Sequence, residues 1–407
     1  MGISIYPIPP DTAAANPLTA FGDLRTAELS PVFQGSFEYT VDNTELTESI
    51  TQNGGTVTQA SGMAVLSTST TTASHARLHS RRRAKYRAGL GGLLRFTALF
   101  TSPVAATIQY IGLADVHGSS AEFVNGLTVG YTGTVFAFQR WQNDVLVDEV
   151  AQANWDDPMD GTGASGMTLD QTKINVFEIK FQYLGGGAIT LMLESDTTGM
   201  FVKAHTIHYA NQNTSPSTHN PNYILMIHAD NLGTTSDIIV KCSSYAFFIE
   251  GETQYIEVQQ PLFSSGNQET SAVTTELAIL TIRNKVLYNS KANYIDVLLE
   301  AISVSIEASG ANNLATIRVV KNAALGGTPA YVDISATDSI VDMDVAGTTV
   351  TGGRELFSFA LAGKNDKLFH GVTEHKLYLS SGETLTISAI SAASATVDAS
   401  LLWKELF

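Results

Sequence analysis

The stretch "VFEIKFQYLGGGAITLMLE", residues 176–194, decides the fold class of this chain. Apolar side chains take every second position from 177 to 183 and again from 189 to 193. A period of two puts one set of side chains on the buried face of a sheet, so each half predicts a half-buried antiparallel strand. Three glycines at 185–187 separate the halves and predict a turn, because glycine tolerates the backbone angles that turns require.

Short runs of the same kind continue on both sides of this stretch. They include "GMAVLS", "RFTALF", "IQYIGLA" and "TVFAFQRW" before it, and "LATIRVV", "ELFSFAL" and "ATVDASLLW" towards the C-terminus. No stretch of about a dozen residues shows the apolar spacing of a helix. The pattern predicts an all-β chain of two tandem antiparallel β-sandwiches, at residues 35–250 and 269–407, joined by a polar linker at 251–268.

Composition limits the functions open to the chain. Its 407 residues carry a formal net charge of -16, which argues against broad nucleic-acid binding because phosphate contacts need a positive footprint. Cys242 is the single cysteine, so no intrachain disulfide can form. No apolar run approaches the roughly 20 residues of a membrane helix, and no membrane partner is expected.

The N-terminal residues 1–34 are predicted to form an extended arm. Five of the eleven prolines fall there, and proline removes the N–H donors that regular structure needs. A solvated tail is one interpretation. The segment also carries apolar residues suited to a contact with a neighbouring subunit, namely Ile3, Ile5, Ile8 and Phe21.

A dense basic cluster lies within "HSRRRAKYRAGLGGLLRF", residues 79–96. A nucleic-acid grip would normally add several aromatic side chains for stacking, and only Tyr86 is near. Arginine pairs bidentately with carboxylates, and the chain has 39 of them, so carboxylates of the same chain or of a neighbouring subunit are the favoured partners. A solvated charged face is the remaining alternative. The subunit-interface candidates of this cluster are Arg81, Arg82, Arg83, Lys85 and Arg87.

Several longer stretches resemble a family of structural proteins of tailed bacteriophages and other large viruses. They include "AFGDLRTAELSPVFQGSFEYTVD" at 20–42, "RRRAKYRAGLGGLLRFTALFT" at 81–101 and "IRNKVLYNSKANYIDVLLEAISVSIEAS" at 282–309. The resemblance implies a lectin-like jelly roll followed by a second β-sandwich. It also implies a place in the virion, with other virion proteins and further copies of this chain as partners.

Two functional hypotheses follow. The first is a non-enzymatic virion structural protein in a symmetric tail or head appendage, with a capsid decoration protein as a variant of it. The second is a module that recognises a host-surface glycan. Its candidate sugar-stacking residues are Tyr131, Trp141 and Trp155, although core or turn positions would explain these aromatic residues equally well.

Evidence in the sequence for metal binding or catalysis is weak. The Gly-rich loop "NWDDPMDGTGASGMTLD" holds the weak calcium candidates Asp156, Asp157 and Asp160, but its spacing is not that of an EF-hand, and local Asx turns are the simpler interpretation. His205 and His208 are three apart, which on a strand sends them to opposite faces. No nucleophile elbow, phosphate loop or dinucleotide fingerprint is present, so no cofactor and no enzymatic activity are expected.

Overall fold

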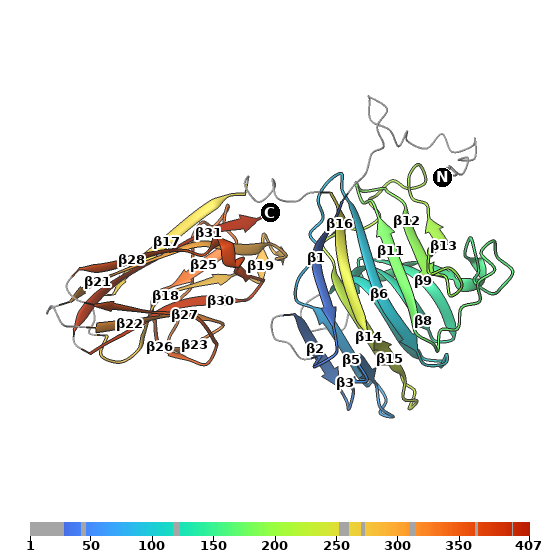
Figure 1. Ribbon diagram of the computed structural model, residues 1–407, viewed down its shortest axis with the longest axis horizontal. Helices are drawn as coiled ribbons and strands as arrows, with labels where there is room; N and C mark the ends of the chain where they lie inside the picture. Colours follow the sequence, from blue (N-terminus) through green and yellow to red (C-terminus); the bar gives the residue numbers. More distant parts are fainter. Residues whose placement is uncertain are drawn as a thin grey trace, which may run out of the picture.

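The computed structural model describes residues 28–41, 46–116, 123–251, 260–269, 273–308, 314–362, 365–392 and 394–407. In this part of the chain the protein is all-β, with only two short 3-10 turns. Two antiparallel β-sandwiches lie side by side along the long axis (Figure 1). The predicted fold class is therefore confirmed. The arm candidates Ile3, Ile5, Ile8 and Phe21 lie outside the described residues.

The first sandwich is built from a nine-stranded and a seven-stranded sheet. The nine-stranded sheet contains β1 (Leu29–Ser36), β3 (Thr56–Ala60), β4 (Met63–Ser67), β6 (Gly91–Phe100), β11 (Asn175–Phe181), β12 (Ile189–Glu194), β13 (Phe201–Ile207), β15 (Ile239–Cys242) and β16 (Ser244–Glu250). The seven-stranded sheet has the order β10 (Val145–Ala151), β9 (Val135–Gln142), β8 (Phe123–Thr132), β7 (Thr107–Val116), β14 (Ile224–Asn231), β5 (His75–Ser80) and β2 (Thr47–Gln52). The turn η1 (Gln152–Asn154) follows β10.

The stretch at 176–194 folds as the alternation predicts. Strands β11 and β12 pair antiparallel, with Phe177 opposite Leu193. In the turn, the backbone N–H groups of Gly186 and Gly187 donate to the carbonyl of Tyr183 at 2.8 and 2.9 Å. Gly185 has a φ of 84°, which a residue with a Cβ adopts only at a cost. This hairpin therefore needs glycine at its bend.

The core of the first sandwich lies between its two sheets and is rich in aromatic rings. Phe96 and Phe177 stack with their centroids 5.5 Å apart, and Phe181 packs edge-on against Tyr223 at 5.7 Å. Each fully buried side chain of this size contributes roughly 1.5–3 kcal/mol. The core thus stabilises the first sandwich without a disulfide, since Cys242 is buried and unpaired.

The second sandwich packs a five-stranded sheet on a six-stranded one. The five-stranded sheet contains β17 (Leu262–Glu269), β31 (Ala395–Leu406), β21 (Asp296–Ala308), β28 (Asp366–Gly371) and β29 (Tyr378–Leu379). The six-stranded sheet has the order β24 (Val332–Asp333), β25 (Val341–Asp344), β18 (Leu277–Asn284), β30 (Thr384–Ser391), β22 (Leu314–Lys321) and β27 (Arg354–Ala362). Two small ribbons, β19 (Leu287–Tyr288) with β20 (Lys291–Ala292) and β23 (Ala324–Gly327) with β26 (Gly347–Thr351), and the turn η2 (Thr373–His375) complete it.

Two sequence-based boundaries differ from the strand ends. The boundary expected at residue 35 falls inside β1, which pairs with β16 from Leu29 onward. Pro31 fits there because it sits at a register shift in the outermost strand on this side, where a missing N–H is tolerated. The linker expected at 251–268 includes most of β17, and residues 252–259 lie outside the described ranges.

Candidate functional site

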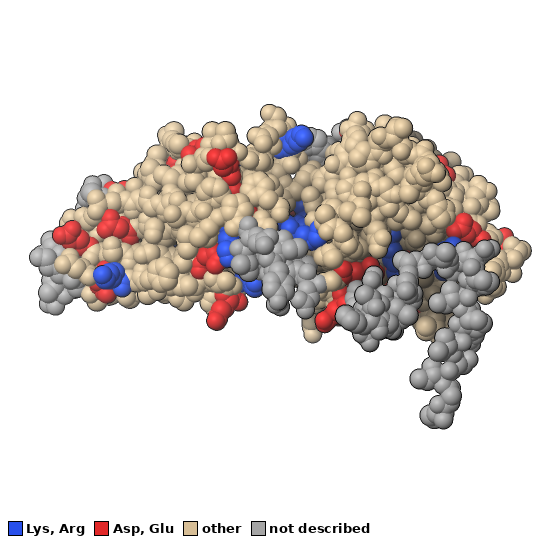
Figure 2. Space-filling model, turned by 90° about the horizontal axis from the view of Figure 1, so that it is seen from above, with Lys and Arg blue, Asp and Glu red and all other residues tan. Residues whose placement is uncertain are grey.

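The basic cluster, residues 81–87, lies where the two sandwiches meet. The chain leaves the seven-stranded sheet after Ser80, and its remaining link to strand structure is an isolated bridge from Ala84 to Tyr223. The cluster is therefore a loop and not a strand, so alternating strand faces do not describe its side chains. Figure 2 shows Lys and Arg side chains gathered in the groove between the two lobes.

Lys85 and Arg83 reach the second sandwich. The Nζ of Lys85 is 2.9 Å from Oδ2 of Asp296 and donates to the carbonyl of Leu406 at 3.4 Å. The guanidinium of Arg83 lies over the ring of Tyr294, 3.9 Å from its centroid. It is also 3.7 Å from the carboxylate of Asp115 in the first sandwich. The expectation that these cations meet carboxylates thus corresponds to contacts within one chain.

The other three cations of the cluster spread over both sandwiches. Arg81 pairs with Glu48 at 3.4 Å, in its own sandwich. Arg82 lies 5.7 Å from the ring centroid of Tyr378, in the second sandwich. Arg87 donates to the carbonyl of the terminal residue, Phe407, at 3.2 Å. The C-terminus accordingly lies at the junction, between the two lobes (Figure 1).

Burial shifts the pKa values of three ionisable side chains at this junction. It lowers the pKa of both Arg83 and Lys85, although Tyr294, Asp115 and Asp296 act in the opposite direction. Burial also raises the pKa of Asp115, against the hydrogen bond from Tyr294 and the charge of Arg83. The cationic forms of Arg83 and Lys85 are therefore incompletely compensated by the groups around them.

A cavity of about 560 Å³ opens beside these contacts. Its described lining carries two acidic side chains, Asp296 and Glu383, and one of them is 2.9 Å from Lys85 while the other is 3.0 Å from Lys321. Cations outnumber them: Arg81, Arg82, Arg83, Lys85, Arg87, Lys321, Arg354 and Lys376 all line the cavity. Apolar side chains such as Val32, Leu46 and Leu356 fill out the walls.

Sequence reasoning singled out only one side of this site. Tyr294, Asp296 and Tyr378 come from the second sandwich and were not identified as candidates. Nothing local distinguishes them, because their role depends on a contact between residues that are far apart in the chain. The segment "NYID" at 293–296 is typical of the start of an ordinary strand.

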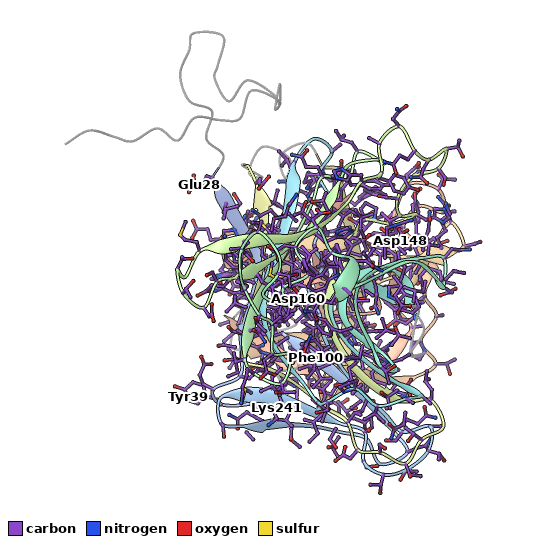
Figure 3. The ribbon with its side chains drawn as sticks, turned by 90° about the vertical axis from the view of Figure 1, so that its right-hand side faces the viewer. Glu28, Tyr39, Phe100, Asp148, Asp160 and Lys241 are labelled. Atoms are coloured by element: carbon purple, nitrogen blue, oxygen red, sulfur yellow. The ribbon has the colours of Figure 1, made fainter. Side chains whose placement is uncertain are left out.

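The sugar-stacking candidates pack against other residues of the first sandwich. Tyr131 is 5% exposed and Trp155 is 4% exposed, and both belong to the core of the first sandwich. Trp141 packs against Tyr110 with centroids 5.6 Å apart and donates its indole N–H to Thr128 at 3.2 Å. The core interpretation therefore holds for Tyr131 and Trp155. Among the described residues of this sandwich, Tyr39 is a large aromatic residue that does project, with 95% of its surface exposed (Figure 3).

The calcium candidates are engaged in local hydrogen bonds. Asp157 accepts from the backbone N–H groups of Met159 and Ser165 at 3.2 and 2.7 Å. Asp160, labelled in Figure 3, accepts from the N–H and hydroxyl of Thr162, and these hydrogen bonds lower its pKa. These are the Asx turns that the loop composition favours.

The remaining candidate pairs with basic side chains. Asp156 lies 3.3 Å from both Lys203 and His205. Within the described ranges, no group of three or more His, Cys, Asp or Glu is arranged to hold a metal ion. The same residues contain no helix long and apolar enough to cross a membrane.

The similarity of this chain to known proteins is distant. No protein-family model and no curated protein matches the chain. Among solved structures, the carbohydrate recognition domain of Emp47p is 11% identical over 55% of this chain and 98% of its own, with a TM-score of 0.35. Lectin II from Ulex europaeus is 11% identical over 54% and 100% (TM-score 0.35), and a native glycosidic hydrolase 10% over 55% and 97% (TM-score 0.36). At this level of similarity, no ligand or reaction is carried over to this chain.

Proposed function

We propose that the protein is a non-enzymatic structural subunit of a virus particle that assembles with further copies of itself. The viral assignment rests on the sequence resemblance. The observation that carries self-assembly is an open edge of the second sandwich, where strands β27 and β28 form neighbouring borders of its two sheets. Unpaired strand edges are templates for pairing with another chain.

The two border strands follow one another in the chain and face the same side. In the described part of the protein, β27 pairs with β22 and β28 pairs with β21, and neither strand has a second partner. Between them lies an aromatic seam: Phe357 and Phe359 stack at 6.0 Å, and His370 lies 5.4 and 5.5 Å from their rings. The rings hold the two sheets together at this border.

Beside the seam, one large apolar side chain points outward. Phe369 on β28 is 73% exposed, and its neighbours across the sheet are small, with Ser303 directly opposite. Pairing of this strand edge with a second copy of the chain would satisfy the free backbone groups and bury the exposed ring in the same contact. The junction of Lys85 with Asp296 and Arg83 with Tyr294 helps to fix the second sandwich relative to the first, which an ordered assembly requires.

Light scattering behind a sizing column tests this proposal on the full chain. A discrete oligomer is expected, and Phe369→Ser should shift it towards monomer, whereas Leu184→Ser, at a residue 73% exposed on the first sandwich, should not. Deleting residues 2–27 tests the arm and leaves β1 intact. A wild-type chain that is monomeric at every concentration, with or without those residues, would overturn self-assembly.

A further inference from the structure

We propose that the cavity between the two sandwiches binds an acidic oligosaccharide, a short chain of sugars bearing carboxylate or sulfate groups. Its volume of about 560 Å³ falls within the range of small-ligand sites, roughly 300–1,000 Å³. Ligand sites also favour junctions between domains. This inference goes beyond assembly and does not depend on it.

The charge of the cavity selects an anion. The chain as a whole has a net charge of -16, yet the described lining of this cavity has eight Lys and Arg side chains against Asp296 and Glu383. Such a local reversal of sign concentrates anionic ligands at the site. The net charge of the whole chain disfavours long polyanions such as DNA, which would extend beyond the cavity.

Two of the lining cations are deep and costly to keep charged. Arg83 and Lys85 keep 19% and 15% of their side-chain surface exposed, and burial lowers the pKa of each. A bound carboxylate or sulfate would offset part of that desolvation cost, since an opposite charge a few ångströms away favours the ionised form. A bound anion would therefore stabilise the charged forms of these two side chains more than it would stabilise the cations of an exposed basic patch.

The apolar walls favour a sugar over a simple inorganic anion. Leu46 and Ile249 line the cavity from the first sandwich, and Leu356 and Leu377 from the second, with the ring of Tyr378 beside them. A pyranose ring presents apolar C–H faces and polar edges, so it can lie against these walls while its acidic groups meet the cations. Arginine forks match carboxylates and sulfates in geometry.

Cations at the rim come from both sandwiches and can be altered with little risk to folding. Arg82 and Lys376 are exposed residues of the first and second sandwich, and both line the cavity. Lys173 and Lys291 are exposed cations, one in each sandwich, outside the cavity lining. The Arg82→Gln/Lys376→Gln chain and the Lys173→Gln/Lys291→Gln chain thus form a matched pair with equal change in charge.

Isothermal titration of the full-length chain with trigalacturonate, a sulfated heparin disaccharide and neutral maltotriose tests the inference. Trigalacturonate probes the carboxylate source and the heparin fragment the sulfate source. We expect at least one acidic sugar to bind, with maltotriose at least tenfold weaker. The rim pair should weaken binding at least tenfold, and the control pair less than threefold. The affinity should fall with added salt.

Three results would overturn the inference. They are no binding of either acidic sugar, binding that the rim pair leaves unchanged, and tighter binding of an acidic peptide such as hexaglutamate than of both sugars. Light scattering on the same samples reports the oligomeric state separately. A chain that assembles but binds no acidic sugar would contradict this inference alone. A chain that binds acidic sugar as a monomer would contradict the proposed self-assembly alone.

Discussion

The ammonium group of Lys85, in the first sandwich, lies 2.9 Å from the carboxylate of Asp296, at the start of a central strand of the second sandwich. Both side chains are largely buried, with 15% and 21% of their surfaces exposed. The ion pair thus links the two sandwiches. Four of the five cations of the basic cluster meet carboxylates or aromatic rings of their own chain, and the fifth, Arg87, donates to the carbonyl of Phe407.

Removing one member of this pair should destabilise the junction. Lys85→Met leaves Asp296 as a largely buried carboxylate without its main cation, and we expect a loss of about 1–3 kcal/mol in the free energy of unfolding. Asp296→Asn should cost a similar amount. Denaturant unfolding of both single variants and the double variant measures their coupling, which should be about 0.5–3 kcal/mol for residues in contact. Strictly additive losses would show that the two groups do not interact.

The contact of Arg83 with Tyr294 should depend on the ring more than on the hydroxyl. Tyr294→Phe keeps the ring under the guanidinium but removes the hydrogen bond to Asp115, whereas Tyr294→Leu removes both. A buried cation–π contact contributes about 1–2 kcal/mol. We therefore expect the leucine variant to lose clearly more stability than the phenylalanine variant. Equal losses would assign the stabilisation to the hydrogen bond alone.

Stability should fall as the pH drops below about 6.5, the ordinary pKa of histidine. Burial lowers the pKa of His79 in the folded chain, and Arg77 and Arg83 act in the same direction, while Glu48, 3.5 Å away, opposes them. The unfolded chain then binds more protons than the folded chain, so the contribution is complete above that pH and is lost below it. The slope is at most about 1.4 kcal/mol per pH unit for one histidine.

A histidine variant checks the source of this slope. His79→Gln should flatten the pH dependence between pH 5 and pH 7 as followed by denaturant unfolding. His219→Gln, at an exposed position, serves as the control variant with the same chemical change. An unaltered slope in the His79 variant would place the titration at other buried groups, such as His75, whose pKa burial also lowers.

The sequence predicted the strands well where one face is buried, and the site poorly. Alternation at 177–193 identified β11 and β12 because burial of one face dictates a period of two. Tyr131 could not be assigned, since a strand pattern does not say which face is the core, and Trp155 could not be assigned because it follows the turn η1, where no strand pattern applies. Tyr294 was missed for a different reason: its partner Arg83 lies in the other sandwich, and only the tertiary arrangement brings the two together.

The loop that holds the calcium candidates should need glycine at position 163. A Cβ there would come within 1.9 Å of the Asp157 carboxylate, so Gly163→Ala must displace the side chain that orders the loop. We expect a loss of about 1–3 kcal/mol, typical of overpacking. Gly166→Ala, where a Cβ meets open space but φ is 68°, should cost less, about 1 kcal/mol. Thermal unfolding compares the two, and the reverse order would contradict this account.

Cys242 should report on the unfolding of the first sandwich. It is 1% exposed, and burial raises the pKa of its thiol to about 12, so almost no thiolate is available in the folded protein. Labelling by a thiol reagent should therefore be undetectably slow until the sandwich opens. If opening is in rapid equilibrium, each loss of about 1.4 kcal/mol in stability should speed labelling tenfold. Lys85→Met should then accelerate labelling only if the junction stabilises the first sandwich, whereas fast labelling of the wild-type chain would contradict the buried position.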